Sequence, residues 1–95
     1  MVWRTTDLAD EDIADIETYG TLTFGRSRAA QYVDDLFAAF DLLAALPRMA
    51  QVHDDLPGQP RIYHFRSHNV IYSVEDEDAL IIRVLHASRD IARHL

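Results

Sequence analysis

The sequence predicts a two-layer α+β fold in which an N-terminal strand and a helical hairpin pack on an antiparallel sheet whose last three strands form a meander. Apolar residues recur at three- and four-residue steps through the first half of the chain, which is typical of amphipathic helices. After a loop that contains Pro57, Gly58 and Pro60, the apolar period changes to two, which indicates strands. Helices that pack on one face of such a sheet make a two-layer domain.

The chain is expected to begin with a short strand and an amphipathic helix. Residues 2–5 alternate apolar and polar side chains, as a brief strand does. Thr6 then offers an N-cap hydroxyl to the amides of a first helix. The apolar stripe of this helix comprises Ala9, Ile13, Ile16 and Tyr19 or Gly20. Its opposite face is acidic and is expected to be solvated, or to attract basic residues of a partner.

A second helix is expected from about residue 26 to residue 46, where Pro47 ends it. Residues 20–25 are expected to interrupt the helical pattern before it. The stripe of the second helix comprises Ala29, Val33, Leu36, Phe37, Phe40, Leu43 and Ala44. Two helices joined by so short a link most simply form an antiparallel hairpin.

Three antiparallel strands are expected to follow the loop at residues 49–60. They are Arg61–Phe65, Asn69–Glu75 and Ala79–His86. Residues 66–68 would form the first turn, and the acidic residues 75–78 would bend the chain between the last two strands. A short helical tail is expected over residues 90–95.

Composition restricts the class of protein. A length of 95 residues predicts one domain over residues 1–95. The absence of cysteine excludes disulfides and cysteine-based zinc sites. No apolar run approaches the roughly 20 residues that span a bilayer, so we expect a cytoplasmic protein without membrane contact. Nine Arg, no Lys and 16 acidic residues give a net charge of −7, which argues against general nucleic-acid binding.

Charge is nevertheless uneven along the chain. Residues 61–95 hold five Arg and four His against five acids. Four of those acids lie together at residues 75–78, so the remainder of this C-terminal third is locally basic.

Five ordered segments carry a resemblance to a known family. They are Thr6-x-x-Ala9-x-x-Asp12-Ile13-x-x-Ile16-x-x-Tyr19; Gly25-x-x-x-Ala29-x-x-Tyr32-x-x-x-Leu36, ending in Leu46-Pro47; Arg61; Val70-Ile71-Tyr72; and Ile82-Arg83-Val84-Leu85-His86-x-x-Arg89-Asp90. Through them the chain resembles the ParE toxins of the RelE/ParE toxin–antitoxin superfamily. The last segment is the most distinctive, since the helical spacings alone are only amphipathic.

The resemblance implies a function and its partners. ParE toxins act on DNA gyrase and stall it with broken DNA, and they generally lack the RNA-cleaving residues of RelE. A cognate ParD-like antitoxin forms a hetero-oligomer with the toxin, wraps it with a C-terminal segment and binds promoter DNA with its own N-terminal domain. Many superfamily members are basic, whereas this chain is acidic, which favours contact with a protein over broad contact with RNA.

Two groups of residues are candidates for these contacts. The candidates for binding the target are Arg61, Arg83, His86, Arg89 and Arg93. The candidates for binding the antitoxin are Ile16, Tyr19, Phe24, Tyr32 and Phe40, although core packing is the ordinary interpretation of such apolar side chains. Tyr32 is offset by one residue from the stripe and is the most exposed of them by position.

Catalysis is an alternative interpretation of the same arginines. Arg61 and Arg83 match positions where RNA-cleaving relatives bind the scissile phosphate, with Arg89 nearby. Cleavage also needs a general base and acid, for which relatives use lysines, a terminal tyrosine or a Glu–His pair. This chain has no Lys and no Tyr after Tyr72. The competing interpretation is that these arginines pair with acids. His86, with Ser88 and Asp90 close in sequence, would be either a base or a residue that holds the C-terminus.

Neither a metal nor a cofactor is expected. His64 and His68 have a spacing that suits metal binding on a helix, but they lie in a predicted strand–turn–strand segment without an obvious third ligand. Two alternative functions stay open beside gyrase inhibition. One is a ribosome-dependent mRNA endonuclease, and the other is a degenerate, non-toxic module that only binds its partner.

Overall fold

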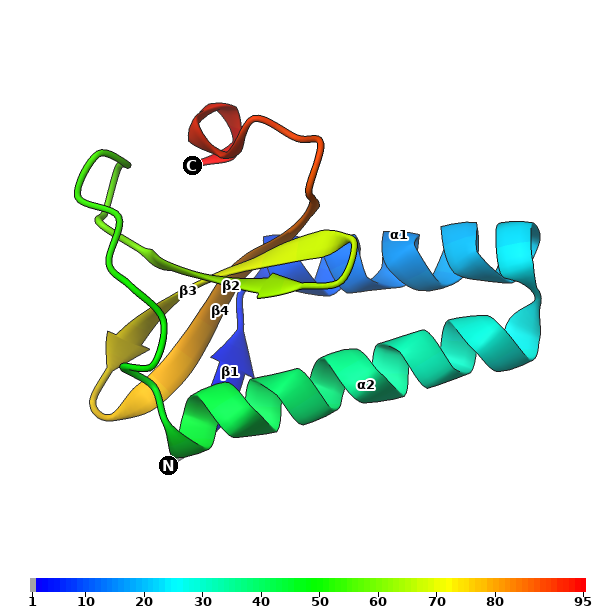
Figure 1. The fold of residues 1–95 in the computed structure, drawn as a ribbon, viewed down its shortest axis with the longest axis horizontal. Helices are drawn as coiled ribbons and strands as arrows, with labels where there is room; N and C mark the ends of the chain where they lie inside the picture. Colours follow the sequence, from blue (N-terminus) through cyan, green and yellow to red (C-terminus); the bar gives the residue numbers. More distant parts are fainter. Residues whose placement is uncertain (1) are drawn as a thin grey trace.

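Residues 2–95, which a computed structural model describes, form two α-helices over a four-stranded sheet (Figure 1). In chain order the elements are β1 (Trp3–Thr5), α1 (Asp7–Phe24), α2 (Arg26–Ala45), β2 (Arg61–Phe65), β3 (His68–Glu75), β4 (Asp78–His86) and the 3-10 helix η1 (Ile91–His94). The strand order is β1-β4-β3-β2. The predicted meander of β2, β3 and β4 is antiparallel, and β1 joins it by pairing parallel to β4. The α+β class is therefore confirmed, with a mixed sheet.

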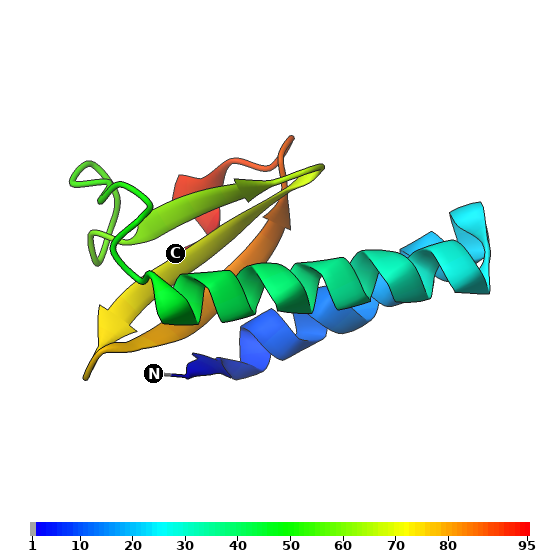
Figure 2. The same ribbon diagram turned by 60° about the horizontal axis from the view of Figure 1, so that its bottom comes forward.

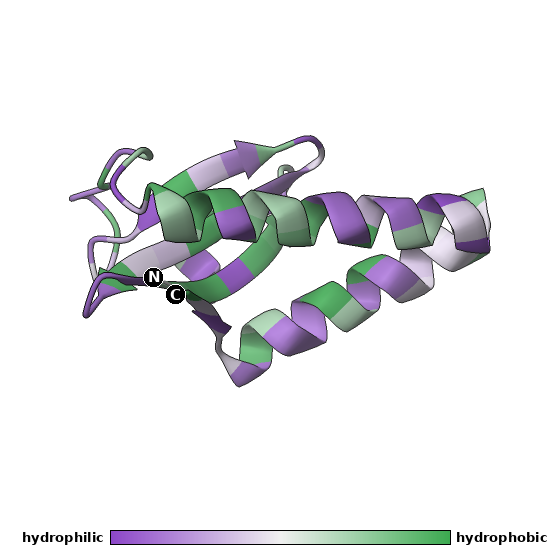
Figure 3. Ribbon diagram, turned by 90° about the horizontal axis from the view of Figure 1, so that it is seen from below, coloured by the Kyte–Doolittle hydropathy of each residue, from purple (hydrophilic) through white to green (hydrophobic). Residues whose placement is uncertain are grey.

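The two α-helices form an antiparallel hairpin whose tip projects beyond the sheet (Figures 1 and 2). η1 lies on the side of the sheet opposite α2. Hydrophilic and hydrophobic residues alternate along both helices, as their amphipathic periods predict (Figure 3). Neither of them, within residues 2–95, has the length and apolar character needed to cross a membrane.

The predicted interruption of the first helix at residues 20–25 is wrong. α1 continues through Phe24, and only Gly25, with φ of 95°, separates it from α2. Gly20 serves helix packing, because a Cβ added to it would lie 3.2 Å from the Cβ of Ala29. Glycine costs only about 1 kcal/mol in a helix, so close approach of the two helices outweighs its poor propensity.

A β-bulge in β4 connects the sheet to the start of α1. Tyr72 of β3 pairs with Ile81 and its neighbour Ile71 pairs with Arg83, which leaves Ile82 as the extra residue. The Ile82 carbonyl accepts a hydrogen bond of 2.7 Å from the Thr6 hydroxyl. The same hydroxyl accepts a bond from the backbone N–H of Ala9, as predicted for the N-cap.

The core lies between the helices and the inner face of the sheet. Six of the seven α2 residues predicted for the core are buried, and Ala39 is buried as well. Phe40, Leu36 and Leu43 are fully enclosed, and burial of each such side chain contributes about 1.5–3 kcal/mol. Phe37 differs from the prediction, because it reaches the surface and stacks on Trp3 at 5.7 Å.

The turns and the tail are shorter than expected. β3 begins at His68, so the first hairpin turn is only Arg66 and Ser67. Asp76 and Glu77 both have positive φ and form a two-residue turn between β3 and β4. The second helix ends at Ala45, and the predicted tail is confirmed in part as η1, which Asp90 caps through the N–H of Ala92.

We expect Thr6→Ala to lower the free energy of unfolding by about 1–2 kcal/mol, because it removes the N-cap and the hydroxyl bond to the bulge. Chemical denaturation measures this change. The matched control is Thr18→Ala, in the middle of α1 on its exposed face, which is expected to change stability by less than about 0.5 kcal/mol. Equal effects of the two variants would contradict the assigned role of Thr6.

Candidate functional site

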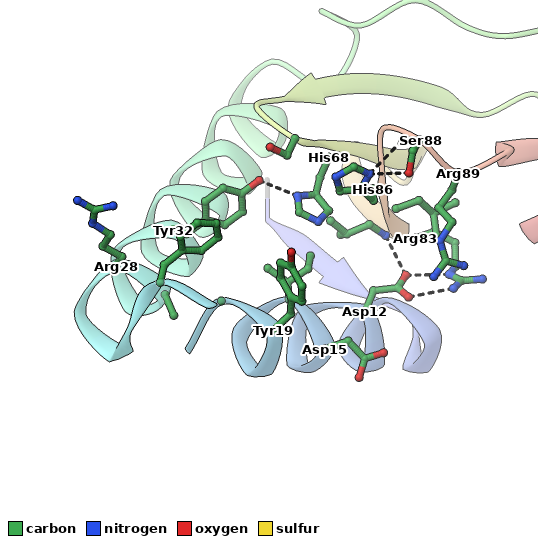
Figure 4. Close-up of a pocket in the computed structure, with 17 residues that line it drawn as sticks. Asp12, Asp15, Tyr19, Arg28, Tyr32, His68, Arg83, His86, Ser88 and Arg89 are labelled. Atoms are coloured by element: carbon green, nitrogen blue, oxygen red, sulfur yellow. Dashed lines mark hydrogen bonds and ion pairs between the residues drawn. The ribbon is translucent and has the colours of Figure 1, made fainter. Parts of the chain in front are cut away.

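A groove of about 850 Å³ lies between the helical hairpin and the end of the sheet where β3 begins and β4 ends (Figure 4). Its apolar wall is formed by α1 and α2. The residues of that wall include Ile16, Tyr19, Phe24, Ala29 and Tyr32. Its polar wall contains Arg83, His86, Ser88 and Arg89 on or after β4, with His68 at the start of β3.

Asp12 and Arg83 form an ion pair that joins α1 to β4 at the edge of the groove. Arg83 donates from Nε at 2.8 Å and from Nη2 at 2.9 Å to the two carboxylate oxygens of Asp12. The backbone N–H of Val84 donates to the same carboxylate at 3.0 Å, and Nη1 of Arg83 donates to the His94 carbonyl at 3.3 Å. The two side chains are only 12% and 14% exposed. Hydrogen bonding to Asp12 raises the pKa of Arg83 above its usual value.

Arg83 has a structural role here, because its hydrogen bonds join β4 to α1 and to the C-terminal tail. Each of its three nitrogens donates within the chain and the side chain is only 14% exposed, so little of the guanidinium is open to a phosphate. The geometry therefore favours the interpretation in which Arg83 pairs with an acid and orders the sheet.

Tyr32 of the apolar wall meets His68 and His86 of the polar wall across the groove. The Tyr32 hydroxyl lies 2.6 Å from Nδ1 of His68, and the imidazole rings of His68 and His86 are 5.4 Å apart, edge to face. Nδ1 of His86 accepts from the backbone N–H of Ser88 at 3.1 Å and lies 2.8 Å from its hydroxyl. Burial lowers the pKa of His68, with a further contribution from His86, and burial raises the pKa of Tyr32. At neutral pH His68 is thus an uncharged hydrogen-bonding group.

The candidate antitoxin contacts are largely brought together. Ile16, Tyr19, Phe24 and Tyr32 line the groove, and Tyr19 and Phe24 are 66% and 59% exposed. Phe40 does not fit the role of an antitoxin contact, because it is fully enclosed in the core and presents no surface. Its place in the α2 stripe already fitted core packing.

The candidate target contacts are dispersed. Arg89 and His86 line the groove, whereas Arg61 lies at the other end of the meander and donates to the Ala50 carbonyl at 2.6 Å. Arg93 is exposed on η1, 3.6 Å from Asp90. The structure therefore does not bring the five residues into one cationic patch.

His64 and His68 lie on opposite faces of the β2–β3 hairpin. His64 is exposed and bonds Asn69 at 2.8 Å, while His68 lies opposite Phe65 and faces Tyr32. Within residues 2–95 no group of three potential ligands gathers, so the spacing of the two histidines does not correspond to a shared site.

Asp12 and Arg28 are groove residues that were not predicted from the sequence, and His68 was considered there only as a metal ligand. Asp12 occupies the same helical face as Ile16 and Tyr19, at steps of four and three residues, which is the signal that would have identified it. Asp12 was not recognised because several other acidic residues lie beside it in the first turns of α1. No feature of the neighbouring sequence identifies Arg28 or His68 as groove residues.

We expect Asp12→Asn to lower the free energy of unfolding by about 3 kcal/mol, because Arg83 would keep its charge in a nearly enclosed place without a counter-ion. Thermal and chemical denaturation measure the loss. Asp15→Asn is the matched control, one turn further along α1, exposed and without an ion pair in residues 2–95. A loss of similar size in Asp15→Asn would show that the stability depends on the total charge of α1 and not on the ion pair between Asp12 and Arg83.

Acidification is expected to destabilise the protein through His68. Because its pKa is lowered in the folded state, the unfolded chain takes up the proton first as the pH falls below about 6.5. Neutral His68 contributes fully to the free energy of unfolding above that pH, and this contribution is lost as the pH falls toward the folded-state pKa. Melting temperatures between about pH 7.5 and about pH 5 should fall less steeply in His68→Gln than in the wild type. A slope in His68→Gln equal to that of the wild type would refute the assignment.

Known proteins resemble this chain both in sequence and in fold. The model of the family described as the ParE toxin of type II toxin–antitoxin system, parDE, matches residues 4–91. Toxin ParE1 of Caulobacter vibrioides is 36% identical over 93 residues, which cover 98% of this chain and 96% of that protein. Toxin ParE1 of Mycobacterium tuberculosis is 34% identical over 73 residues, which cover 76% and 74% of the two chains.

A solved structure shares the fold. A chain from the chromosomal ParDE TA system of P. aeruginosa superposes with a TM-score of 0.77 at 19% identity, covering 90% of this chain and 95% of that one. The family model spans nearly the whole chain, and the Caulobacter relative is similar across almost its full length. The chain therefore belongs to the ParE toxin family of type II toxin–antitoxin systems.

Proposed function

We propose that this ParE-family toxin inhibits DNA gyrase in the cytoplasm and is held inactive by a ParD-like antitoxin, one segment of which occupies the groove between the hairpin and the sheet. The observation that carries the proposal is this groove, which has an exposed aromatic wall and lies beside the cationic segment after β4.

The apolar wall supports binding of a protein segment. Tyr19 and Phe24 are mostly exposed, and their rings contact each other edge to face at 6.5 Å. Exposed aromatic residues that gather on one surface mark a partner-binding site more often than a solvated face. An amphipathic segment would bury its apolar side chains against them, in the way that helices bind in grooves.

The edge of the sheet offers the same partner a second contact. β2 is an edge strand, and the bridge between Val52 and Arg61 covers only its first residue. The outer side of Ile62–Phe65 has no strand partner within the described chain. An extended continuation of the antitoxin segment would pair there by strand addition.

The candidate contacts for the target overlap this groove. His86 and Arg89 lie on its polar wall, and Arg93 follows in η1. A segment seated in the groove would cover His86 and Arg89 and keep them from gyrase. Neutralisation by direct blocking is therefore the mechanism that this arrangement supports best.

A ribosome-dependent mRNA endonuclease is the second candidate, and one observation favours it. Tyr32, His68, His86 and Arg89 line the same groove, so groups able to transfer protons lie near an arginine. The net charge of −7, the absence of lysine and the engagement of Arg83 by Asp12 weigh against it.

The proposal is tested by incubating the purified chain with DNA gyrase and plasmid DNA. We expect supercoiling to be lost and cleaved DNA to accumulate, and addition of the antitoxin from the adjacent gene to restore supercoiling. No effect on gyrase, together with messenger cleavage in a translating extract that His86→Ala abolishes, would favour the endonuclease. Normal growth when the chain is induced without its antitoxin would favour a non-toxic binding module.

Tyr19→Asp is expected to weaken antitoxin binding by about tenfold or more, because it places a charge on the apolar wall of the groove. Isothermal titration with the antitoxin measures the change. Leu46→Asp is the matched control, an apolar residue of similar exposure (56%) at the far end of α2 and outside the groove. If both variants bind like the wild type, the groove is not the antitoxin site.

A further inference from the structure

Most of the nine arginines of this chain are engaged by the chain itself. Five form ion pairs, namely Arg4 with Glu75, Arg48 with Glu77, Arg66 with Asp35, Arg83 with Asp12 and Arg93 with Asp90. Arg61 donates to backbone carbonyls. Within residues 2–95, only Arg26, Arg28 and Arg89 have neither an ion pair nor a side-chain hydrogen bond. Two of these three line the groove.

The groove also differs in charge from the rest of the chain. The residues that line it include three arginines against two aspartates, although the whole chain carries −7. Arg83 and Asp12 neutralise each other, which leaves Arg28 and Arg89 with Asp15 as the formal charges available to a ligand. In an acidic protein without lysine, the groove is thus a place where positive charge remains unpaired.

Arg28 and Arg89 lie at opposite ends of this groove (Figure 4). Arg28 comes from the first turns of α2, and Arg89 comes from the segment that follows β4. The tyrosine rings of the apolar wall lie between them. A segment that runs along the groove would therefore meet a guanidinium, then an apolar surface, then a second guanidinium.

We propose that Arg28 and Arg89 form a two-arginine clamp that selects an amphipathic protein segment with apolar side chains in its middle and a carboxylate toward each end. This rests on the proposed function, in which the segment belongs to the antitoxin. A guanidinium binds a carboxylate through two parallel hydrogen bonds, which gives orientation as well as attraction. At physiological salt, charges more than about 8 Å away are largely screened. The local charges of the groove, two arginines against Asp15, therefore favour a ligand with negative charge.

The clamp is tested with three charge reversals that alter the net charge equally: Arg28→Glu, Arg89→Glu and, as the matched control, Arg26→Glu. Arg26 is exposed, lies two residues before Arg28 in α2 and does not line the groove. We expect the dissociation constant of the complex with the antitoxin to rise by about tenfold in each groove variant and by no more than about twofold in the control. Equal losses in all three variants would indicate long-range charge alone and overturn the clamp, as would no loss in either groove variant.

A second measurement separates the clamp from the proposed function. Two 16-residue helical peptides share one apolar stripe and carry either Glu or Lys at both ends, and they are titrated into the intact chain. We expect the wild type to prefer the Glu peptide by about tenfold and the Arg28→Glu/Arg89→Glu variant to prefer the Lys peptide. Failure of the wild type to bind its antitoxin would remove the proposed function, whereas loss of the peptide preference would remove the clamp. Circular dichroism of each variant verifies that the fold is unchanged.

Discussion

The carboxylate of Asp12 is the constraint on which the rest of the structure depends. It accepts two hydrogen bonds from Arg83 and one from the backbone of Val84, immediately after the bulge in β4. Because Arg83 also donates to the His94 carbonyl, one acid fixes the first helix, the central strand and the tail relative to one another. An unpaired charge in so enclosed a place costs several kcal/mol. Displacement of α1 along the sheet is therefore strongly disfavoured.

This fixed point also explains why the groove exists. α1 is held to the sheet at its first turns, by Thr6 and Asp12, while its 18 residues extend about 27 Å. Its second half consequently passes beyond the strands together with α2 (Figure 2). Gly20 lets the helices approach closely at Ala29, so the projecting hairpin is stabilised by its own packing. Apolar residues such as Tyr19 then have no sheet beneath them, and the groove is the space that remains.

The sequence was sufficient for features that depend on local periodicity and insufficient for those that depend on distant partners. The strands, both helices and the α2 core followed from apolar spacing, and four of the five apolar antitoxin candidates lie at the groove. The pairing of Asp12 with Arg83 joins residues 71 positions apart, and no local pattern encodes it. The role of Gly20 could not be predicted either, because a single sequence does not distinguish a glycine that interrupts a helix from one that permits close helix packing. Phe40 was misassigned because a stripe does not reveal which apolar residues the fold leaves uncovered.

The distribution of charge connects the stability of this protein with the recognition proposed for it. Ion pairs within the chain occupy most of the arginines, and each exposed pair adds only about 0–1 kcal/mol to stability. The larger effect of these ion pairs is that the paired guanidiniums bind an acidic ligand less well than the unpaired ones do. Specific recognition requires that wrong sites bind weakly as well as that the right site binds well. The chain engages six of its nine arginines within itself, and two of the other three line one groove. A net charge of −7 is therefore compatible with selective capture of an acidic segment at that groove.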